Sequence, residues 1–268
     1  MEEIVKKLIE NDNLIWKNIL SIRSDKRFKS LDIVKNIFSD FFELHGDRNF
    51  GDDKSIVGGI TYLENIPLTL ICQYKGKNSV DSKERQYGMP LPEGYRKALR
   101  LMKQAQKFNR PIICFIDTPG AYPGINAEER GQAEAIARNL KVMSSLTVPI
   151  ISLIVSEGGS GGALALGVAN KVYMMERAIY SVVSPEGCAS ILWKDPLKAN
   201  LASEYLKITS SEIFKAGIAD GVISEKGTFK EICKRISGVL YEDLKRMQKM
   251  PPEKIKEERK LKFRNIGM

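Results

Sequence analysis

The order of apolar and polar positions along the chain predicts helices at its start. Residues 1–20 repeat apolar positions at helical spacing, and residues 32–43 carry a second apolar face. A basic linker over residues 23–29 separates the two. We predict a helix in each segment and an N-terminal helical arm over residues 1–44.

Residues 45–228 predict the core of the molecule. Apolar runs between turn residues predict strands, and apolar residues on one face of a longer segment predict helices. The predicted strands are residues 55–63, 67–74, 111–117, 149–155, 172–175 and 179–183, and the predicted helices are residues 92–108, 127–146 and 162–169. Alternation of this kind, with some wholly apolar strands, indicates an α/β fold whose strands are covered on both faces.

Helical signals also mark the last part of the chain. Thr209 and Glu212 have the spacing of a capping box, which predicts that a helix begins there. Residues 229–249 predict a further helix that a Pro-Pro pair ends, and a charged tail follows. We assign residues 229–268 to a C-terminal helical extension.

One pattern occurs twice in the predicted core. Residues 111–116 read P-I-I-C-F-I, and residues 149–154, at an offset of 38, read P-I-I-S-L-I. The same offset pairs two glycines of the first unit with two of the second, Gly120 with Gly158 and Gly124 with Gly162. We predict that the core uses one unit twice: a buried strand, a glycine loop and a helix.

The densest chemical signal is the second of these loops, S-E-G-G-S-G-G-A at residues 156–163. Glycines let the backbone approach a ligand closely, and the first N–H groups of the following helix lack internal acceptors. Such a loop can stabilise an anion or a developing oxyanion. A tight packing turn explains the same glycines, and the residues alone leave both interpretations open.

Other motifs fit this loop poorly. Gly158-x-Ser160-x-Gly162 matches the nucleophile elbow of α/β-hydrolases, but that fold places its histidine after the serine, and this chain has only His45 upstream. A phosphate-binding P-loop needs G-K-[ST] after the glycines, and a dinucleotide fingerprint needs a glycine where Leu164 stands. An oxyanion hole without a protein nucleophile remains.

The first loop reads D-T-P-G-A-Y-P-G over residues 117–124, a rigid turn after a strand that can shape a substrate site. Glu128 and Glu129 open the next helix. Acidic residues there stabilise a helix start, and a hydratase would use the same carboxylates as acid and base.

The net charge of +9 is uneven, because residues 75–110 hold ten basic and three acidic residues. Residues 241–268 add +4. The stretch predicts either an anion-binding patch or a solvated helix face. Its few aromatic residues, Tyr87, Tyr95 and Phe108, disfavour nucleic-acid stacking.

The counts of histidine and cysteine narrow the chemistry. One histidine cannot supply a His-rich zinc site, and four scattered cysteines without a C-x-x-C pair are typical of reduced core residues. The N-terminus has no signal-peptide core, and the longest apolar run, residues 148–155, is far shorter than the about 20 residues of a membrane helix. We expect a soluble, cytoplasmic protein with no metal in this chain.

Several long motifs in a fixed order resemble one known family. They are E-L-H-G-D-R at residues 43–48, D-K-S-I-V-G-G at 53–59, G-M-P-L-P-E-G-Y-R-K-A-L-R-L-M at 88–102, F-I-D-T-P-G-A-Y-P-G at 115–124, A-E-E-R-G-Q at 127–132, the glycine loop at 157–163, and Y-S-V-V-S-P-E-G-C-A-S-I-L-W-K-D at 180–195. From about residue 30 to about residue 225 the chain resembles the alpha subunit of the bacterial acetyl-CoA carboxylase carboxyltransferase.

The resemblance implies a crotonase-type fold of repeated ββα units wound into a superhelix. It implies transfer of a carboxyl group from carboxybiotin, on a biotin carboxyl carrier protein, to a coenzyme A thioester, acetyl-CoA, which gives malonyl-CoA for fatty acid synthesis. It further implies an α2β2 tetramer with a beta subunit that carries a zinc ribbon, and a separate biotin carboxylase that consumes ATP. Another crotonase-fold acyl-CoA enzyme, such as a hydratase, is the alternative.

The resemblance also implies roles for the two loops. The second glycine pair of the loop, Gly161 and Gly162, corresponds to an oxyanion hole. The residues expected to bind substrate are Gly120, Tyr122, Gly124, Gly158, Gly159 and Ser160. The chain departs from the family at residues 73–76, where Q-Y-K-G replaces H-Q-K-G, and at residues 225–230, where E-K-G-T-F-K replaces a G-G-A-H segment.

Overall fold

The structure is a computed structural model and describes residues 13–267. Within these residues eight strands form one sheet in the order β1-β2-β3-β4-β5-β6-β8, and β7 pairs with the end of β5. The strands are β1 (Ser39–Glu43), β2 (Ile56–Leu63), β3 (Ile66–Gln73), β4 (Ile112–Thr118), β5 (Ile150–Gly159), β6 (Lys171–Met175), β7 (Ile179–Ser181) and β8 (Gly221–Ile223).

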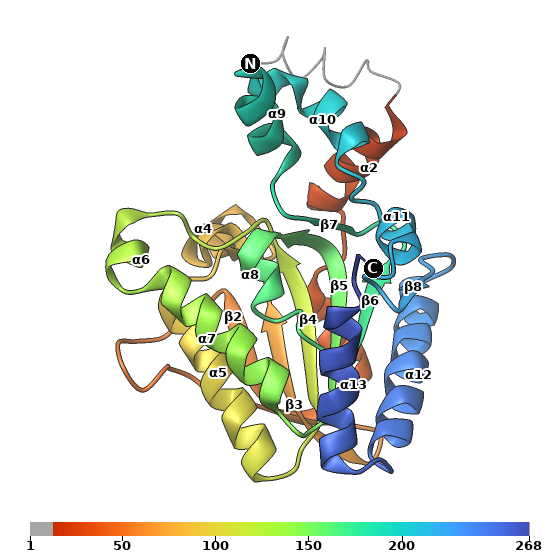
Figure 1. The fold of residues 1–268 in the computed structure, drawn as a ribbon. Helices are drawn as coiled ribbons and strands as arrows, with labels where there is room; N and C mark the ends of the chain where they lie inside the picture. Colours follow the sequence, from red (N-terminus) through yellow and green to blue (C-terminus); the bar gives the residue numbers. More distant parts are fainter. Residues whose placement is uncertain (1–12, 268) are drawn as a thin grey trace.

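Helices surround this sheet and extend beyond one end of it (Figure 1). The helices are α2 (Leu14–Arg23), α3 (Ser30–Ile37), α4 (Ser79–Glu84), η1 (Gln86–Gly88), α5 (Pro92–Lys107), α6 (Ile125–Glu129), α7 (Gln132–Ser145), α8 (Ser160–Leu164), α9 (Pro185–Trp193), η2 (Pro196–Lys198), α10 (Ala199–Tyr205), α11 (Ser210–Lys215), α12 (Phe229–Met247) and α13 (Pro252–Arg264). None of the helices in the described part of the chain is long and apolar enough to cross a membrane.

The sheet is antiparallel from β1 to β3 and parallel from β3 through β4, β5 and β6 to β8. Every residue of β4 and β5 is buried. Helices α5 and α7 lie in front of the strands in the view of Figure 1, and α3 packs against β3, β4 and α12. Strands buried on both faces explain the wholly apolar runs of the sequence, and the predicted α/β fold is confirmed.

Helices α2, α9 and α10 form a helical head beyond the sheet (Figure 1). Trp16 and Ile19 of α2 are buried against Ala199 and Ile208, and Asn13 donates a hydrogen bond of 2.7 Å to the carbonyl of Asn200. The apolar positions before residue 13 lie outside the described residues. The division of the chain at residues 44 and 228 stays a prediction.

The predicted helix over residues 32–43 is wrong after Ile37. Residues 39–43 form the edge strand β1, which pairs with β2. A Cβ atom on Gly59 would lie 2.1 Å from the carbonyl oxygen of Phe42, so glycine lets the two backbones approach this closely. Pairing with β2 therefore overrides a pattern that fits a helix equally well.

Two predicted helices are shorter than expected. Gly131, in the left-handed region at φ +80°, separates α6 from α7 within residues 127–146. The strand predicted at residues 149–155 continues to Gly159, and α8 ends at Leu164 rather than at Ala169. The glycine segment is thus the end of a strand and the first turn of a helix.

The charged tail contains a helix that charge patterning did not predict. Arg259 of α13 is only 1% exposed. Its guanidinium donates hydrogen bonds to the carbonyls of Met143, Leu146 and Val148 and to the side chain of Asn170. Carbonyls at and just after the end of α7 lack N–H donors from that helix, and Arg259 donates to them.

Two smaller predictions are confirmed. Thr209 and Glu212 form the capping box at the start of α11. All four cysteines are free and buried.

Candidate functional site

The two glycine loops meet because they follow neighbouring parallel strands. Strand β4 ends at Thr118 and strand β5 at Gly159, and Thr118 pairs with Gly158 in the sheet. The carboxyl ends of parallel strands lie at the same edge of a sheet, where ligands of open α/β sheets bind. The structure thus brings together Gly120, Gly158 and Gly159, three of the predicted site residues.

Two of the glycines are required for packing. A Cβ atom on Gly159 would lie 2.0 Å from the carbonyl oxygen of Pro119, and one on Gly162 would lie 2.5 Å from the amide nitrogen of Ala121. Both contacts are with backbone, which cannot move aside as a side chain can. The β4 loop therefore rests directly on the turn between β5 and α8.

Gly161 and Gly120 leave room for a side chain. The nearest atom to a Cβ on Gly161 is in the Ile136 side chain at 3.7 Å, and nothing lies within 4 Å of a Cβ on Gly120 of the β4 loop. Ser160 is exposed. It takes φ +50°, which is unusual for a residue with a side chain.

Tyr122 and Gly124 lie further along the β4 loop. The Tyr122 amide donates a hydrogen bond to the carbonyl of Pro90. The buried side chain of Gln132 donates to the carbonyl of Pro90 and to that of Tyr122. A Cβ on Gly124 would lie 2.3 Å from the Tyr122 ring. These contacts fix the conformation of the loop and place the Tyr122 ring against Gly124.

A buried group of charges lies at the root of the two turns. Lys75 Nζ lies 3.1 Å from Asp117 Oδ1 and 2.8 Å from Glu157 Oε2. Arg23 Nη2 lies 2.6 Å from Glu157 Oε1, and its other amino group lies 2.6 Å from Glu186 of α9. The group thus joins two helices of the helical head, α2 and α9, to the ends of strands β4 and β5.

Opposite charges set the ionisation of this group. Burial alone would raise the pKa of Glu157, but the charges of Lys75 and Arg23 outweigh it and lower this pKa to about 2. Burial alone would lower the pKa of Lys75, and Asp117 and Glu157 keep it above its ordinary value. Glu157 and Lys75 are therefore fixed charges at neutral pH and do not exchange protons with a ligand.

Sequence reasoning did not single out the five residues of this group. Asp117 and Glu157 each stand at the start of a glycine loop, just before its first glycines, and that shared position was an available signal. Arg23 offered no such signal, because in the sequence it belongs to a basic linker. Gln73 was also missed, although its amide donates a 2.8 Å hydrogen bond to the carbonyl of Gly162.

A family model described as acetyl co-enzyme A carboxylase carboxyltransferase-like matches residues 2–267. The chain belongs to this family. Similar proteins include the acetyl-coenzyme A carboxylase carboxyl transferase subunit alpha of Listeria monocytogenes serotype 4b, which is 49% identical over all of this chain and 88% of its own length. The protein of the same name from Streptococcus equi subsp. equi is 55% identical over 90% of this chain and 95% of its own length.

Solved structures share the fold of this carboxyltransferase family member. A transcarboxylase 12S structure with methylmalonyl-coenzyme A bound gives a TM-score of 0.67 at 21% identity; it covers 84% of this chain, which spans 44% of the transcarboxylase chain. A Pseudomonas malonate decarboxylase hetero-tetramer in complex with coenzyme A gives 0.65 at 16% identity over 79% of this chain and 86% of that one. The crotonase-like core expected from the sequence is confirmed.

The alternatives to a carboxyltransferase gain nothing from the geometry. His45 Nδ1 lies 3.1 Å from Asp52 Oδ2 in the segment before β2, so the lone histidine pairs with a carboxylate there. Glu128 and Glu129, the acid and base of a hydratase reading, are exposed on α6.

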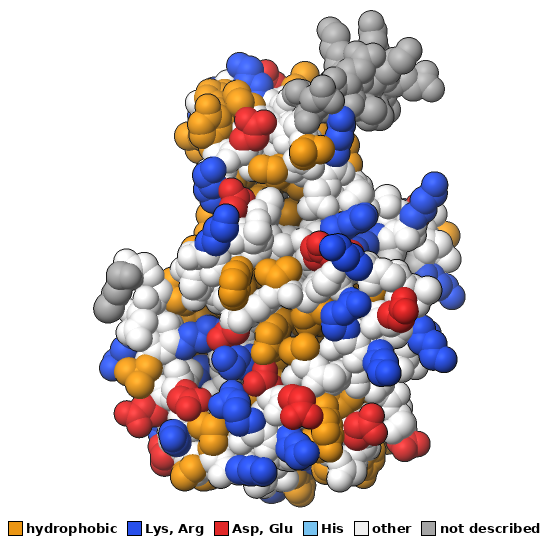
Figure 2. Space-filling view, turned by 90° about the vertical axis from the view of Figure 1, so that its right-hand side faces the viewer, with side chains coloured by type: hydrophobic (Ala, Val, Ile, Leu, Met, Phe, Trp, Pro, Cys, Tyr) orange, Lys and Arg blue, Asp and Glu red, His pale blue; other side chains and the backbone are white. Residues whose placement is uncertain are grey.

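The basic stretch of residues 75–110 is partly neutralised in space. Arg96 Nε lies 2.7 Å from Asp47 Oδ2, and Lys97 Nζ lies 2.5 Å from Asp52 Oδ1. Lys75 also pairs with carboxylates outside the stretch. These carboxylates therefore offset part of the excess of +7 counted along the sequence. On another side of the molecule, which carries α11 and α12, Lys and Arg side chains also lie among Asp and Glu (Figure 2).

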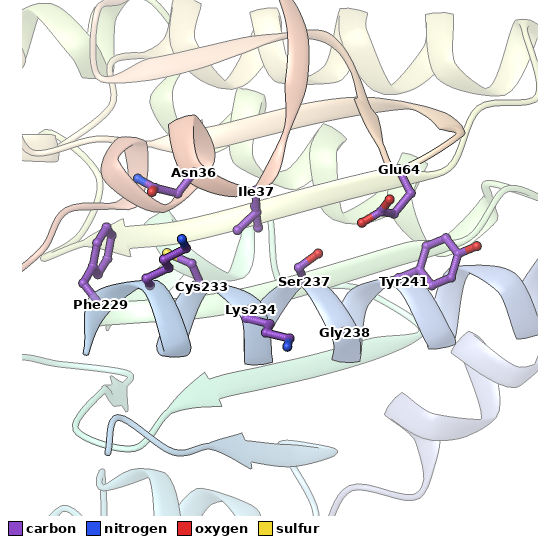
Figure 3. Close-up of a pocket in the computed structure, with 10 residues that line it drawn as sticks. Asn36, Ile37, Glu64, Phe229, Cys233, Lys234, Ser237, Gly238 and Tyr241 are labelled. Atoms are coloured by element: carbon purple, nitrogen blue, oxygen red, sulfur yellow. The ribbon is translucent and has the colours of Figure 1, made fainter. Parts of the chain in front are cut away.

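A groove of about 860 Å³ lies away from the glycine turns, between α3, α12 and the β2–β3 turn (Figure 3). Its lining residues are Asn36, Ile37, Glu64, Phe229, Lys230, Cys233, Lys234, Ser237, Gly238 and Tyr241. None of the predicted site residues is among them.

Proposed function

We propose that this chain is the alpha subunit of an acetyl-CoA carboxylase carboxyltransferase and helps transfer the carboxyl group of carboxybiotin to acetyl-CoA, which gives malonyl-CoA. The match to the family over almost the whole chain carries this proposal. The geometry supports it, because both glycine turns lie together at one edge of the sheet and Gly120 lies beside open space.

The reaction needs hydrogen-bond donors for two oxygens that gain negative charge. One is the enolate oxygen of acetyl-CoA after its methyl group loses a proton, and the other is the ureido oxygen of biotin. We assign the N–H groups of Gly161 and Gly162 to one of these oxygens. As N–H groups of the first turn of α8, these donors lack intrahelical acceptors, and no side chain caps the helix, so they suit an oxyanion.

The remaining predicted residues shape the substrate site around these donors. Gly158 and Gly159 hold the turn by packing, and Ser160 orients it through its left-handed backbone. Gly120, Tyr122 and Gly124 form the opposite wall on the β4 loop. Carboxybiotin supplies the carboxyl group when it is bound. The residues of this chain hold and orient the substrates.

We further propose that the chain works in an α2β2 tetramer with a zinc-ribbon beta subunit, together with the biotin carrier protein and biotin carboxylase. Large apolar side chains exposed on the helical head support a partner surface (Figure 2). They are Val182, Ile191, Leu192, Leu197, Leu201 and Tyr205. The beta subunit would supply the second set of oxyanion donors.

The test is the reverse reaction, the malonyl-CoA-dependent carboxylation of free biotin. The purified chain should be inactive alone and active once the beta subunit is added. Activity of the chain alone would contradict the shared site, and no activity with the beta subunit would contradict the proposed function. Hydration of an enoyl-CoA by the chain would favour the hydratase alternative instead.

A further inference from the structure

We infer that Lys75 is a positioning residue for the carboxyl transfer proposed above, on which this inference rests. Its ammonium group joins the carboxylates that precede the two glycine turns. Lys75 lies just after β3, Asp117 lies in β4 and Glu157 lies in β5. Because these strands are neighbours in the sheet, the three residues lie at the edge that carries the turns.

The clamp formed by Lys75, Asp117 and Glu157 is buried and short. The side chains of Asp117 and Glu157 are 1% and 7% exposed, and Lys75 reaches them over 3.1 and 2.8 Å. The amide of Glu157 also donates to Asp117 Oδ1 at 3.3 Å. Gly88, at φ +78°, packs so closely on the Lys75 stem that a Cβ there would lie 2.5 Å from Lys75 Cγ. The ammonium therefore has little freedom to move.

The position of the clamp along the chain explains its influence on the site. Glu157 directly precedes Gly158, and Asp117 stands three residues before Gly120. A shift of either carboxylate moves the root of a turn. Misplacing reacting groups by about 1 Å can lower turnover by about 100-fold.

The two carboxylates depend on Lys75 to different degrees. Glu157 also pairs with Arg23, whereas within residues 13–267 Lys75 is the only cation in an ion pair with Asp117. Loss of the ammonium would leave Asp117 as an unpaired buried charge, which the protein must hydrate or move toward solvent. The β4 loop would then lose its position against Gly159.

The experiment measures the malonyl-CoA-dependent carboxylation of biotin by the complex with the beta subunit. Lys75→Met should lower kcat by about tenfold or more and leave KM for malonyl-CoA within about threefold, because the clamp positions the turns and does not itself bind the substrate. Lys75→Met/Asp117→Asn removes both charges and should recover most of the lost kcat. Lys260→Met, a matched change at an exposed position of α13, should behave as the wild type.

The outcomes separate the two proposals. An inactive wild-type complex would overturn carboxyl transfer and the positioning role together. An active wild type with an equally active Lys75→Met would overturn only the positioning role. If Lys75→Met does not assemble, the double variant decides: turnover near that of the wild type supports positioning, and an assembled double variant that is about tenfold slower or worse overturns it.

Discussion

The two glycine-bearing units of the core share a sequence pattern but do not superimpose in the sheet. The parallel pairing of β4 and β5 joins Ile112 to Ile150 and Ile116 to Ile154, which is the offset of 38 seen in the sequence. The register then slips, and Thr118 pairs with Gly158 at an offset of 40. The offset of 38 that aligns the glycines in the sequence therefore does not continue into the pairing of the strand ends.

The slip decides how the loops meet. Gly120 meets Gly162 rather than standing beside Gly158, and Pro119 rests on Gly159. The β5 turn is tight and mostly buried, with Ser160 exposed, whereas the β4 loop is longer and half-exposed. A repeated pattern thus produces one packed turn and one loop that covers it, and the proposed site lies where the two meet.

The largest effect should come from adding a methyl group where the two loops touch. Gly159→Ala places a methyl group 2.0 Å from the carbonyl oxygen of Pro119. The free energy of unfolding should fall by about 3 kcal/mol, measured by urea denaturation. Gly161→Ala is the matched control within the same turn, because its methyl group has room. An unchanged urea midpoint for Gly159→Ala would show that the β4 loop does not press on the turn.

The next effect concerns the charge before the β5 turn. The depressed pKa of Glu157, about 2 against 4.5, means that its ionised form stabilises the fold fully above about pH 4.5. This stability, about 3 kcal/mol, is lost as the pH falls from 4.5 toward 2. Glu157→Gln should therefore lose less stability over that range than the wild type does.

Unfolding free energies at a series of pH values test this expectation. Glu128→Gln, at an exposed position of α6, is the control and should keep the acid sensitivity of the wild type. Equal acid sensitivity of Glu157→Gln and the wild type would contradict the role of Lys75 and Arg23 in holding Glu157 ionised.

A smaller effect should separate catalysis from packing. Gly161→Ala places its methyl group in the open space beside the proposed site, 3.7 Å from the nearest side chain. Stability should stay unchanged, while turnover with the beta subunit falls by about tenfold because the substrate can no longer approach the backbone donors. Gly238→Ala on α12, which also meets open space, should leave turnover unchanged. Full activity of Gly161→Ala would remove Gly161 from the site.

The smallest effect concerns the strained serine. Ser160→Gly relieves the left-handed conformation at φ +50° and should raise the free energy of unfolding by up to about 1 kcal/mol. Ser211→Gly, in the regular helix α11, should lower it instead. Thermal unfolding of both variants checks the sign. A loss of stability in Ser160→Gly would mean that the serine side chain stabilises the turn.

Local patterns predicted much of this fold because they act within a few residues. The buried strands β4 and β5, the amphipathic helices α5 and α12 and the capping box of α11 follow from side-chain periodicity and hydrogen bonds between near neighbours. The glycine loops were found for the same reason. The edge strand β1 was missed because its apolar spacing fits a helix until β2 lies beside it.

The sequence by itself determined which segments become buried strands and which turns are rich in glycine. Only the tertiary structure decided that the register slips by two residues after Ile116, that Arg259 satisfies the end of α7, and that Lys75 joins Asp117 to Glu157. The periodicity of apolar residues relates only positions that are close together in the sequence. Ion pairs between strands 40 or more residues apart depend on which strands are neighbours, and only the folded sheet establishes that.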